Sequence, residues 1–172
     1  MSVIGGLMSE HEIFKGLADR LEKSLDYEEP ALRSEVRDTL LILLPALDVH
    51  EEIEETVFGH PLYASKEEAK LLLGETEYQH GQIQKLRAEL IAALQTDSPE
   101  SLPLLKILAA DLVKKLRLHF ETEEKRLWPH YRAYSRSMDK SIKRRLREQV
   151  RQLRKGIDDQ RFALADYFGI RK

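Results

Sequence analysis

The sequence predicts an all-α protein: an antiparallel four-helix bundle of two repeated helical hairpins, with an additional C-terminal helix. The first observation is an apolar pattern at spacings of three and four residues, typical of helices that bury one face. The second is a repeat, because the motif His-x-x-x-Glu occurs at His50–Glu54 and again at His119–Glu123. The third is that the interval from His11 to His50 equals the interval from His80 to His119.

The composition restricts the chemistry that the chain can support. The 172 residues carry a formal net charge of −2 and no cysteine, and they suit a single hydrophobic core. Without cysteine, disulfides, iron–sulfur clusters and cysteine nucleophiles are excluded, so a bound metal would need nitrogen and oxygen ligands. The N-terminus has no basic signal-like stretch, and the longest apolar run, Leu40–Leu44, is far too short to span a membrane. We therefore expect a cytoplasmic protein without a membrane partner.

The first helix is expected to begin near Ile4 and to end at Asp26–Pro30, with Pro30 in the first turn of the next helix. A lone histidine on the inward face of a helix is more often a hydrogen-bonded core residue than a ligand. His11 is therefore a candidate only together with the other histidines. The inward face consists of Ile4, Leu7, His11, Phe14, Ala18, Leu21 and Leu25.

The second and fourth helices repeat each other along their packing faces as well as at the motif. Pro45 interrupts this similarity, because Lys114 holds the same place in the other half. It should remove the backbone hydrogen bond to the Leu41 carbonyl and kink the second helix one turn before the motif. The matching faces are Leu43, Leu47, His50, Glu54 and Phe58 in one half and Leu112, Leu116, His119, Glu123 and Leu127 in the other.

The third helix is expected to open with a capping box formed by Ser65 and Glu68, and the fourth with Ser98 and Pro99 as N-cap and first turn. Two further histidines, His60 and His130, lie beside prolines at helix ends and outside the repeat. We expect them at the surface or close behind the site. The inner face of the third helix carries Leu73, His80, Ile83, Leu86, Leu90 and Leu94.

The two histidines of each half lie equally far from a proline-marked turn, near Pro30 and Pro99. They should therefore lie at one level of an antiparallel helix pair. Residues i and i+4 share a helix face with a rise of about 6 Å, so the glutamate of each motif can reach the same object as its histidine. A metal ion is the object that such side chains suit. The candidate metal ligands are His11, His50, Glu54, His80, His119 and Glu123.

In these six positions the chain resembles the hemerythrin-like HHE cation-binding family, over the region from His11 to Glu123. The resemblance implies two iron ions, oxo- or hydroxo-bridged, with Glu54 and Glu123 each shared between the ions and the histidines divided between them. Mn or Zn would accept the same donors. It further implies a small gas or oxidant ligand, namely dioxygen, peroxide or nitric oxide, in sensing, stress response or iron handling. Glu55 and Glu124, which follow the motif glutamates, are expected to face outward.

The chain departs from the oxygen carriers of that family at Gln84, where they have a further histidine one turn after the third-helix histidine. One iron would then keep a position that water, Glu51 or a tyrosine could fill, which argues against simple reversible oxygen carriage. Enzymatic turnover, of the di-iron peroxidase or catalase-like kind, stays open. A ferritin-type oxidase is excluded by spacing, since among the six histidines only His80 has a glutamate, Glu77, three positions before it.

Residues 133–172 have no counterpart in the repeat and are expected to form a basic amphipathic helix beside the bundle of residues 1–132. Residues 140–155 carry eight basic side chains against Glu148 alone, a net charge of +7. No alternation of aromatic and basic residues favours nucleic acid as a partner. An alternative function is a metal-stabilised helical interaction module acting through this helix. Its apolar seam, which predicts packing on the bundle or in a homodimer, is Ile142, Leu146, Val150, Leu153 and Ile157.

Overall fold

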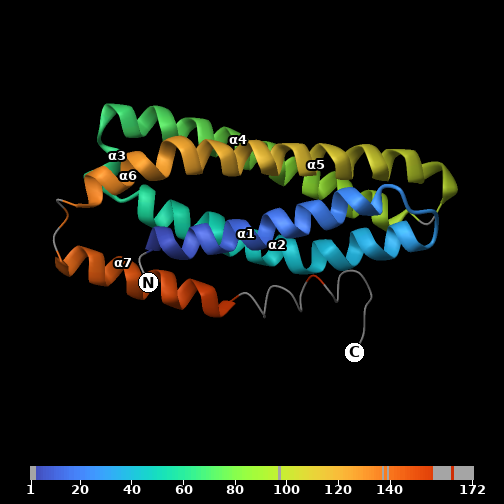
Figure 1. Ribbon diagram of the computed structural model, residues 1–172, viewed down its shortest axis with the longest axis horizontal. Coiled ribbons are helices and arrows are strands. Elements are labelled where there is room, and N and C mark those ends of the chain that lie inside the picture. Colours follow the sequence, from blue (N-terminus) through green and yellow to red (C-terminus); the bar gives the residue numbers. More distant parts are fainter. Residues whose placement is uncertain (1–2, 97, 137, 139, 157–163, 165–172) are drawn as a thin grey trace.

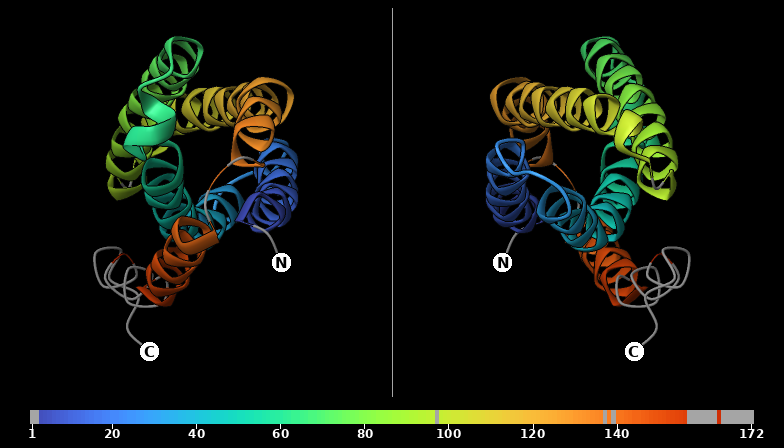
Figure 2. Two further views of the ribbon diagram at one scale, coloured as in Figure 1. Left: turned by 90° about the vertical axis from the view of Figure 1, so that its left-hand side faces the viewer. Right: turned by 90° about the vertical axis from the view of Figure 1, so that its right-hand side faces the viewer.

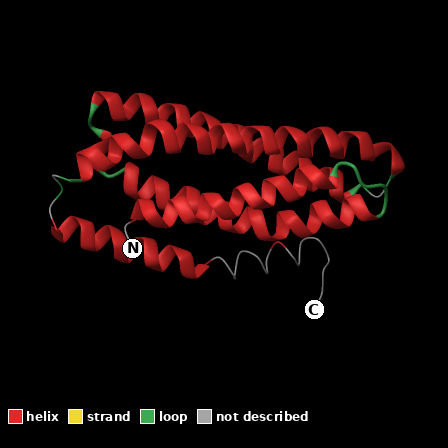
Figure 3. Ribbon diagram, in the orientation of Figure 1, coloured by secondary structure: helices red, strands yellow, loops and turns green. Residues whose placement is uncertain are grey.

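The computed structural model describes residues 3–96, 98–136, 138, 140–156 and 164, and every element among them is helical (Figures 1 and 3). The predicted all-α bundle is confirmed. Its four long helices are α1 (Val3–Ser24), α2 (Ala31–Phe58), α4 (Glu67–Gln95) and α5 (Leu102–Thr122). Seen end-on, they surround a common core, with α4 packed on α5 and α1 packed on both α2 and α5 (Figure 2).

The core is built from the faces that the repeat predicted. Leu43 and Leu47 of α2 and their counterparts Leu112 and Leu116 of α5 are completely buried in one apolar cluster. The inward face of α1 is buried from Ile4 to Leu21. Helix α2 runs through Pro45 to Phe58, and the kink expected there stays a prediction.

The connections between the helices differ from the sequence prediction. A short helix, α3 (Pro61–Ala64), lies in the connection after α2. The capping box at Ser65 is wrong, because α4 begins at Glu67 after Lys66, and no side chain caps it. Ser98 does act as a cap, but for a 3₁₀ turn, η1 (Pro99–Ser101), where its Oγ accepts from the backbone N–H of Glu100; α5 starts after this turn.

The fourth helix of the bundle, α5, does not end near Pro129 as the sequence predicted. It passes through a π-helical turn, η2 (Glu123–Leu127), directly into α6 (Trp128–Ser135). Proline is costly inside a helix because it cannot supply the N–H of the regular ladder. Here the wider π turn has already interrupted that ladder before Pro129, since the N–H of Trp128 bonds to the carbonyl of Glu123. Helical structure therefore continues beyond the proline.

Helix α7 (Lys140–Leu153) lies along the outside of the bundle against α2 and is followed by a 3₁₀ turn, η3 (Arg154–Gly156) (Figure 1). Leu146 and Val150 are buried in a second apolar cluster with Val49 and Ile53 of α2. Ile157, the last residue of the predicted seam, lies outside the described residues. The division of the chain at residue 132 stays a prediction. None of the helices in the described part of the chain combines the length and apolar character needed to cross a bilayer.

Candidate metal centre

All six candidate ligands meet inside the bundle, at one level of the four long helices. Each is buried, with at most 8% of its surface exposed. Their donor atoms form two groups, and within each group the atoms lie within 4.8 Å of one another. Glu54 and Glu123 belong to both groups. The first group also contains the histidines of the first hairpin, His11 and His50, and the second group contains those of the second hairpin, His80 and His119.

Every histidine turns its Nε2 atom toward the centre. The Nε2 atoms of His11 and His50 are 3.0 Å apart, and those of His80 and His119 are 3.2 Å apart. The equal spacing of the histidines in the two hairpins produces this arrangement, because it sets both histidines of a hairpin at one height on neighbouring helices. Each hairpin therefore contributes one pair of ring nitrogens.

The two carboxylates reach between these pairs. Glu123 places Oε2 3.2 Å from Nε2 of His11 and Oε1 3.3 Å from Nε2 of His119. Glu54 does the same, with one oxygen 3.4 Å from the histidine of its own motif and the other 3.6 Å from the histidine of α4. All four carboxylate oxygens are buried without a hydrogen-bond partner. Such groups are costly unless a cation compensates them.

The outward nitrogens of three histidines are bound by side chains that are not among the six candidate ligands. A histidine that donates from Nδ1 keeps the lone pair of Nε2 for a metal, and an anionic acceptor makes that nitrogen a stronger donor. The Nδ1 atoms pair with Glu124 at 2.9 Å from His11, with Glu10 at 2.8 Å from His50, and with Gln79 at 3.1 Å from His119.

The repeat held a signal for two of these partners. Glu10 and Gln79 hold equivalent positions in the two halves, each directly before the first histidine of its half. Each reaches across its hairpin to the second histidine. The prediction that Glu124 faces outward is wrong. Its side chain is half-buried and is held by His11 and by the Lys15 ammonium at 2.8 Å. Glu55, its counterpart, is exposed as expected.

A further contact ties the C-terminal turn to the centre. Arg154 of η3 donates from Nε to the second oxygen of Glu10 at 2.7 Å, while the first oxygen is bound to His50. Gly6 of α1 leaves the room for this arginine, since a Cβ atom there would lie 2.5 Å from Nη2 of Arg154. The histidine, the glutamate and the arginine thus form a chain of polar contacts from the centre to η3.

Burial and mutual charge set the protonation of the metal-free cluster. Burial, together with the nearby His50, lowers the pKa of His11 to about 2, and burial likewise lowers the pKa of His119 to about 3. For His50 burial lowers the pKa, but the charge of Glu54 and the contacts with Glu10 and Glu123 together outweigh burial and raise the pKa well above its ordinary value. Burial and the negative charge of Glu54 raise the pKa of Glu123 in the same direction. A cation entering this cluster would find neutral imidazoles at His11 and His119 and would displace protons from His50 and Glu123.

Glu51 lies beside the second group without belonging to it. It is 5% exposed, and its Oε2 accepts a hydrogen bond of 3.2 Å from Nε2 of Gln84. Burial raises the pKa of Glu51, which favours its neutral form.

His60 and His130 are outside both groups, as expected. His60 accepts from the backbone of α3, and His130 links the Tyr63 hydroxyl to the carboxylate of Glu68.

A cavity of about 280 Å³ lies against Glu54 and His80, at the side of the second group. Apolar side chains from α2, α4 and η2 line much of it, including Phe58 and Leu127. The exposed Glu77 also contributes to its wall. The cavity therefore runs from acidic side chains at the surface to one carboxylate and one imidazole of the cluster.

The family comparison agrees with this geometry. The model of the hemerythrin HHE cation-binding domain matches residues 2–103 and, in a second overlapping match, residues 77–167. The chain belongs to the hemerythrin HHE family. The family match and the buried cluster of histidines and glutamates together support a metal cofactor for this hemerythrin-like bundle. Searches among curated proteins and among solved structures found no match.

Proposed function

We propose that this hemerythrin-like protein holds two iron ions in the bundle and binds a small oxidant or gas there, as dioxygen, peroxide or nitric oxide. One observation carries the proposal: the four oxygens of Glu54 and Glu123 are buried without hydrogen-bond donors, and four imidazole nitrogens face them. The donor set fits two cations that share both carboxylates. Imidazole and carboxylate suit Fe, Mn and Zn about equally, so the choice of iron rests on the family.

The grouping of donors suggests how the ligands divide. His11 and His50 would hold one ion and His80 and His119 the other, each ion also receiving one oxygen from Glu54 and one from Glu123. Four donors leave coordination positions open on an ion that prefers six. Bound iron supplies the redox and Lewis-acid chemistry that these side chains lack.

The protein's own contribution is to orient the donors and to exclude water. The Nδ1 partners fix the ring orientations, and the buried leucine layers of α2 and α5 close one end of the centre. The cavity beside Glu54 and His80 offers a small ligand a route on the other side. An apolar wall favours entry of neutral molecules, which suits dioxygen, nitric oxide and undissociated hydrogen peroxide.

Metal analysis of purified protein tests the proposal. We expect about two irons per chain after anaerobic loading with ferrous iron, and loss of at least one in His119→Ala with the helical circular-dichroism spectrum retained. His60→Ala is the matched control, because it removes a histidine outside both groups and should keep both ions. Full iron content in His119→Ala, or none in the unaltered protein, would refute the assignment.

A second measurement separates binding from turnover. Peroxide consumption that is proportional to iron content and is lost in His80→Ala would assign peroxidase or catalase-like activity. A stoichiometric spectral change without continued consumption would assign a binding or sensing role.

A further inference from the structure

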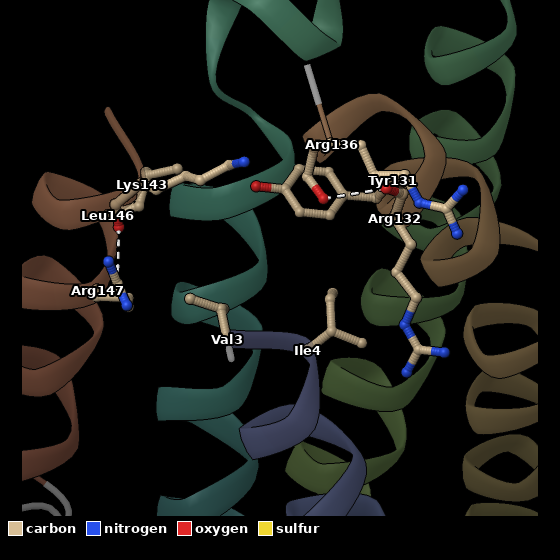
Figure 4. A pocket seen from close by; sticks show the side chains of 9 residues that line it. Val3, Ile4, Tyr131, Arg132, Arg136, Lys143, Leu146 and Arg147 are labelled. Atoms are coloured by element: carbon tan, nitrogen blue, oxygen red, sulfur yellow. Dashed lines mark hydrogen bonds between the residues drawn. The ribbon is translucent and has the colours of Figure 1, made fainter. Parts of the chain in front are cut away.

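A second, larger cavity lies away from the metal centre, between the first turn of α1 and the helices α6 and α7 (Figure 4). Its volume of about 450 Å³ is within the range of small-molecule sites in proteins, about 300–1,000 Å³. Figure 4 shows α7 on one side, α6 on the other, and the beginning of α1 below. None of the six candidate metal ligands lines it.

The floor of this cavity is apolar. Val3 and Ile4 of α1 form its lower part in Figure 4, and Leu146 of α7 and the ring of Tyr131 close the sides. Ile4, Leu146 and Tyr131 are at most 5% exposed, so the floor is part of the packed second apolar cluster. A hydrocarbon group placed here would leave water for a preformed apolar surface.

The rim is strongly basic, and none of the described residues that line it is acidic. Other arginines nearby are paired: Arg151 of α7 with Glu148, and Arg154 of η3 with Glu10. Within the described part of the chain, no carboxylate pairs with the four basic side chains of the rim. Four positive charges around one opening repel one another and focus a positive potential on it. The rim consists of Arg132, Arg136, Lys143 and Arg147.

We propose that this cavity binds a carboxylate with a hydrocarbon body, such as a medium-chain fatty acid. The carboxylate would supply the negative charge that the described part of the chain does not place at the rim. Guanidinium groups bind carboxylates with strong charge-assisted hydrogen bonds. The hydrocarbon body would lie on Val3, Ile4 and Leu146. This site is independent of the metal centre and needs no metal.

Calorimetric titration of the full chain with decanoate tests the proposal. We expect saturable binding at up to about 1 mM decanoate, and at least tenfold weaker binding of 1-decanol, which has the same body without the charge. The double variant Lys143→Glu/Arg147→Glu should weaken decanoate binding about tenfold or more, since it reverses two rim charges. Arg144→Glu/Arg145→Glu is the matched control, because these exposed arginines on the same helix do not line the cavity.

A second variant keeps the test independent of the charge reversals. Val3→Phe at a partly exposed floor position should reduce decanoate affinity with all rim charges intact, and thermal melts verify that each variant is folded. The proposal is overturned by absence of saturable binding, by equal binding of decanol, or by equal losses in the two double variants. Binding to anionic lipid vesicles without binding to free decanoate would also overturn it and would assign the basic rim to a membrane surface.

Discussion

Replacing Glu10 by glutamine should weaken metal binding while leaving the bundle folded. The carboxylate of Glu10 lies 2.8 Å from Nδ1 of His50 and 2.7 Å from Nε of Arg154. Glutamine retains one oxygen acceptor but loses the negative charge that makes the His50 ring a stronger donor. Loss of such a supporting group costs about 10–100-fold in metal affinity, or about 1.4–2.8 kcal/mol.

The structure places Glu10→Gln near the lower limit of this range. At the equivalent position of the other half, Gln79 orients His119 with an amide oxygen, so an amide is geometrically acceptable. We therefore expect about a tenfold loss, measured by competition with a chelator of known affinity. Glu22→Gln is the control, since this exposed glutamate of the same helix pairs with Arg117, away from the candidate ligands. Unchanged affinity in Glu10→Gln, or an equal loss in the control, would refute the reasoning.

Three further predictions concern stability and titration. Metal at about 1,000 times its dissociation constant should stabilise the fold by about 4 kcal/mol. The melting temperature should then be about 8–16 °C higher than that of chelator-treated protein. Equal melting curves would contradict a metal bound to the folded state. In urea denaturation Leu116→Ala should cost about 2–5 kcal/mol because it empties a core position, whereas Leu118→Ala, 55% exposed, should change stability by no more than about 0.5 kcal/mol. Burial raises the pKa of Tyr63 and of Tyr131 to about 12, above their unfolded value. Their contribution to stability should therefore be complete below about pH 10 and be lost toward pH 12, and an alkaline ultraviolet titration should lose one late-titrating group in Tyr63→Phe.

The repeat is the reason why the fold and the convergence of the candidate ligands could be predicted from the sequence. One interval separates the two histidines within each hairpin, and a second interval relates the first hairpin to the second. Together with the proline-marked turns, these intervals determine both the pairing and the register of the helices. The structure brings all four histidines and both motif glutamates together. The helical periodicity likewise predicted the buried face of α1, because apolar burial dominates the choice of an inward face.

The contacts that surround the site could not be predicted in the same way. Glu124 reaches His11 from another helix, and Glu10 is shared between His50 and the sequence-distant Arg154. Such contacts depend on side-chain rotamers and on the packing of neighbouring helices, which a periodic pattern does not encode. The π turn after Glu123 is similar, since no local residue preference distinguishes a wide turn from a regular one.

The same contacts make the two halves of the candidate ligand set unequal. His11 and His50 both pair through Nδ1 with carboxylates, whereas His119 pairs with the amide of Gln79. Carboxylate partners raise the basicity of a metal-bound imidazole, so the first hairpin should hold its ion more tightly, by about tenfold.

Glu51 does not remove this difference. It lies beside the second group, but burial raises its pKa and favours the neutral form, which adds little negative charge there. Titration with less than one equivalent of metal should therefore fill the first group before the second. His80→Ala should retain one tightly bound ion, and His11→Ala should lose the tight step. The opposite result would show that Glu51 is ionised when metal binds and that the second hairpin, despite its neutral amide partner, is the stronger half of the centre.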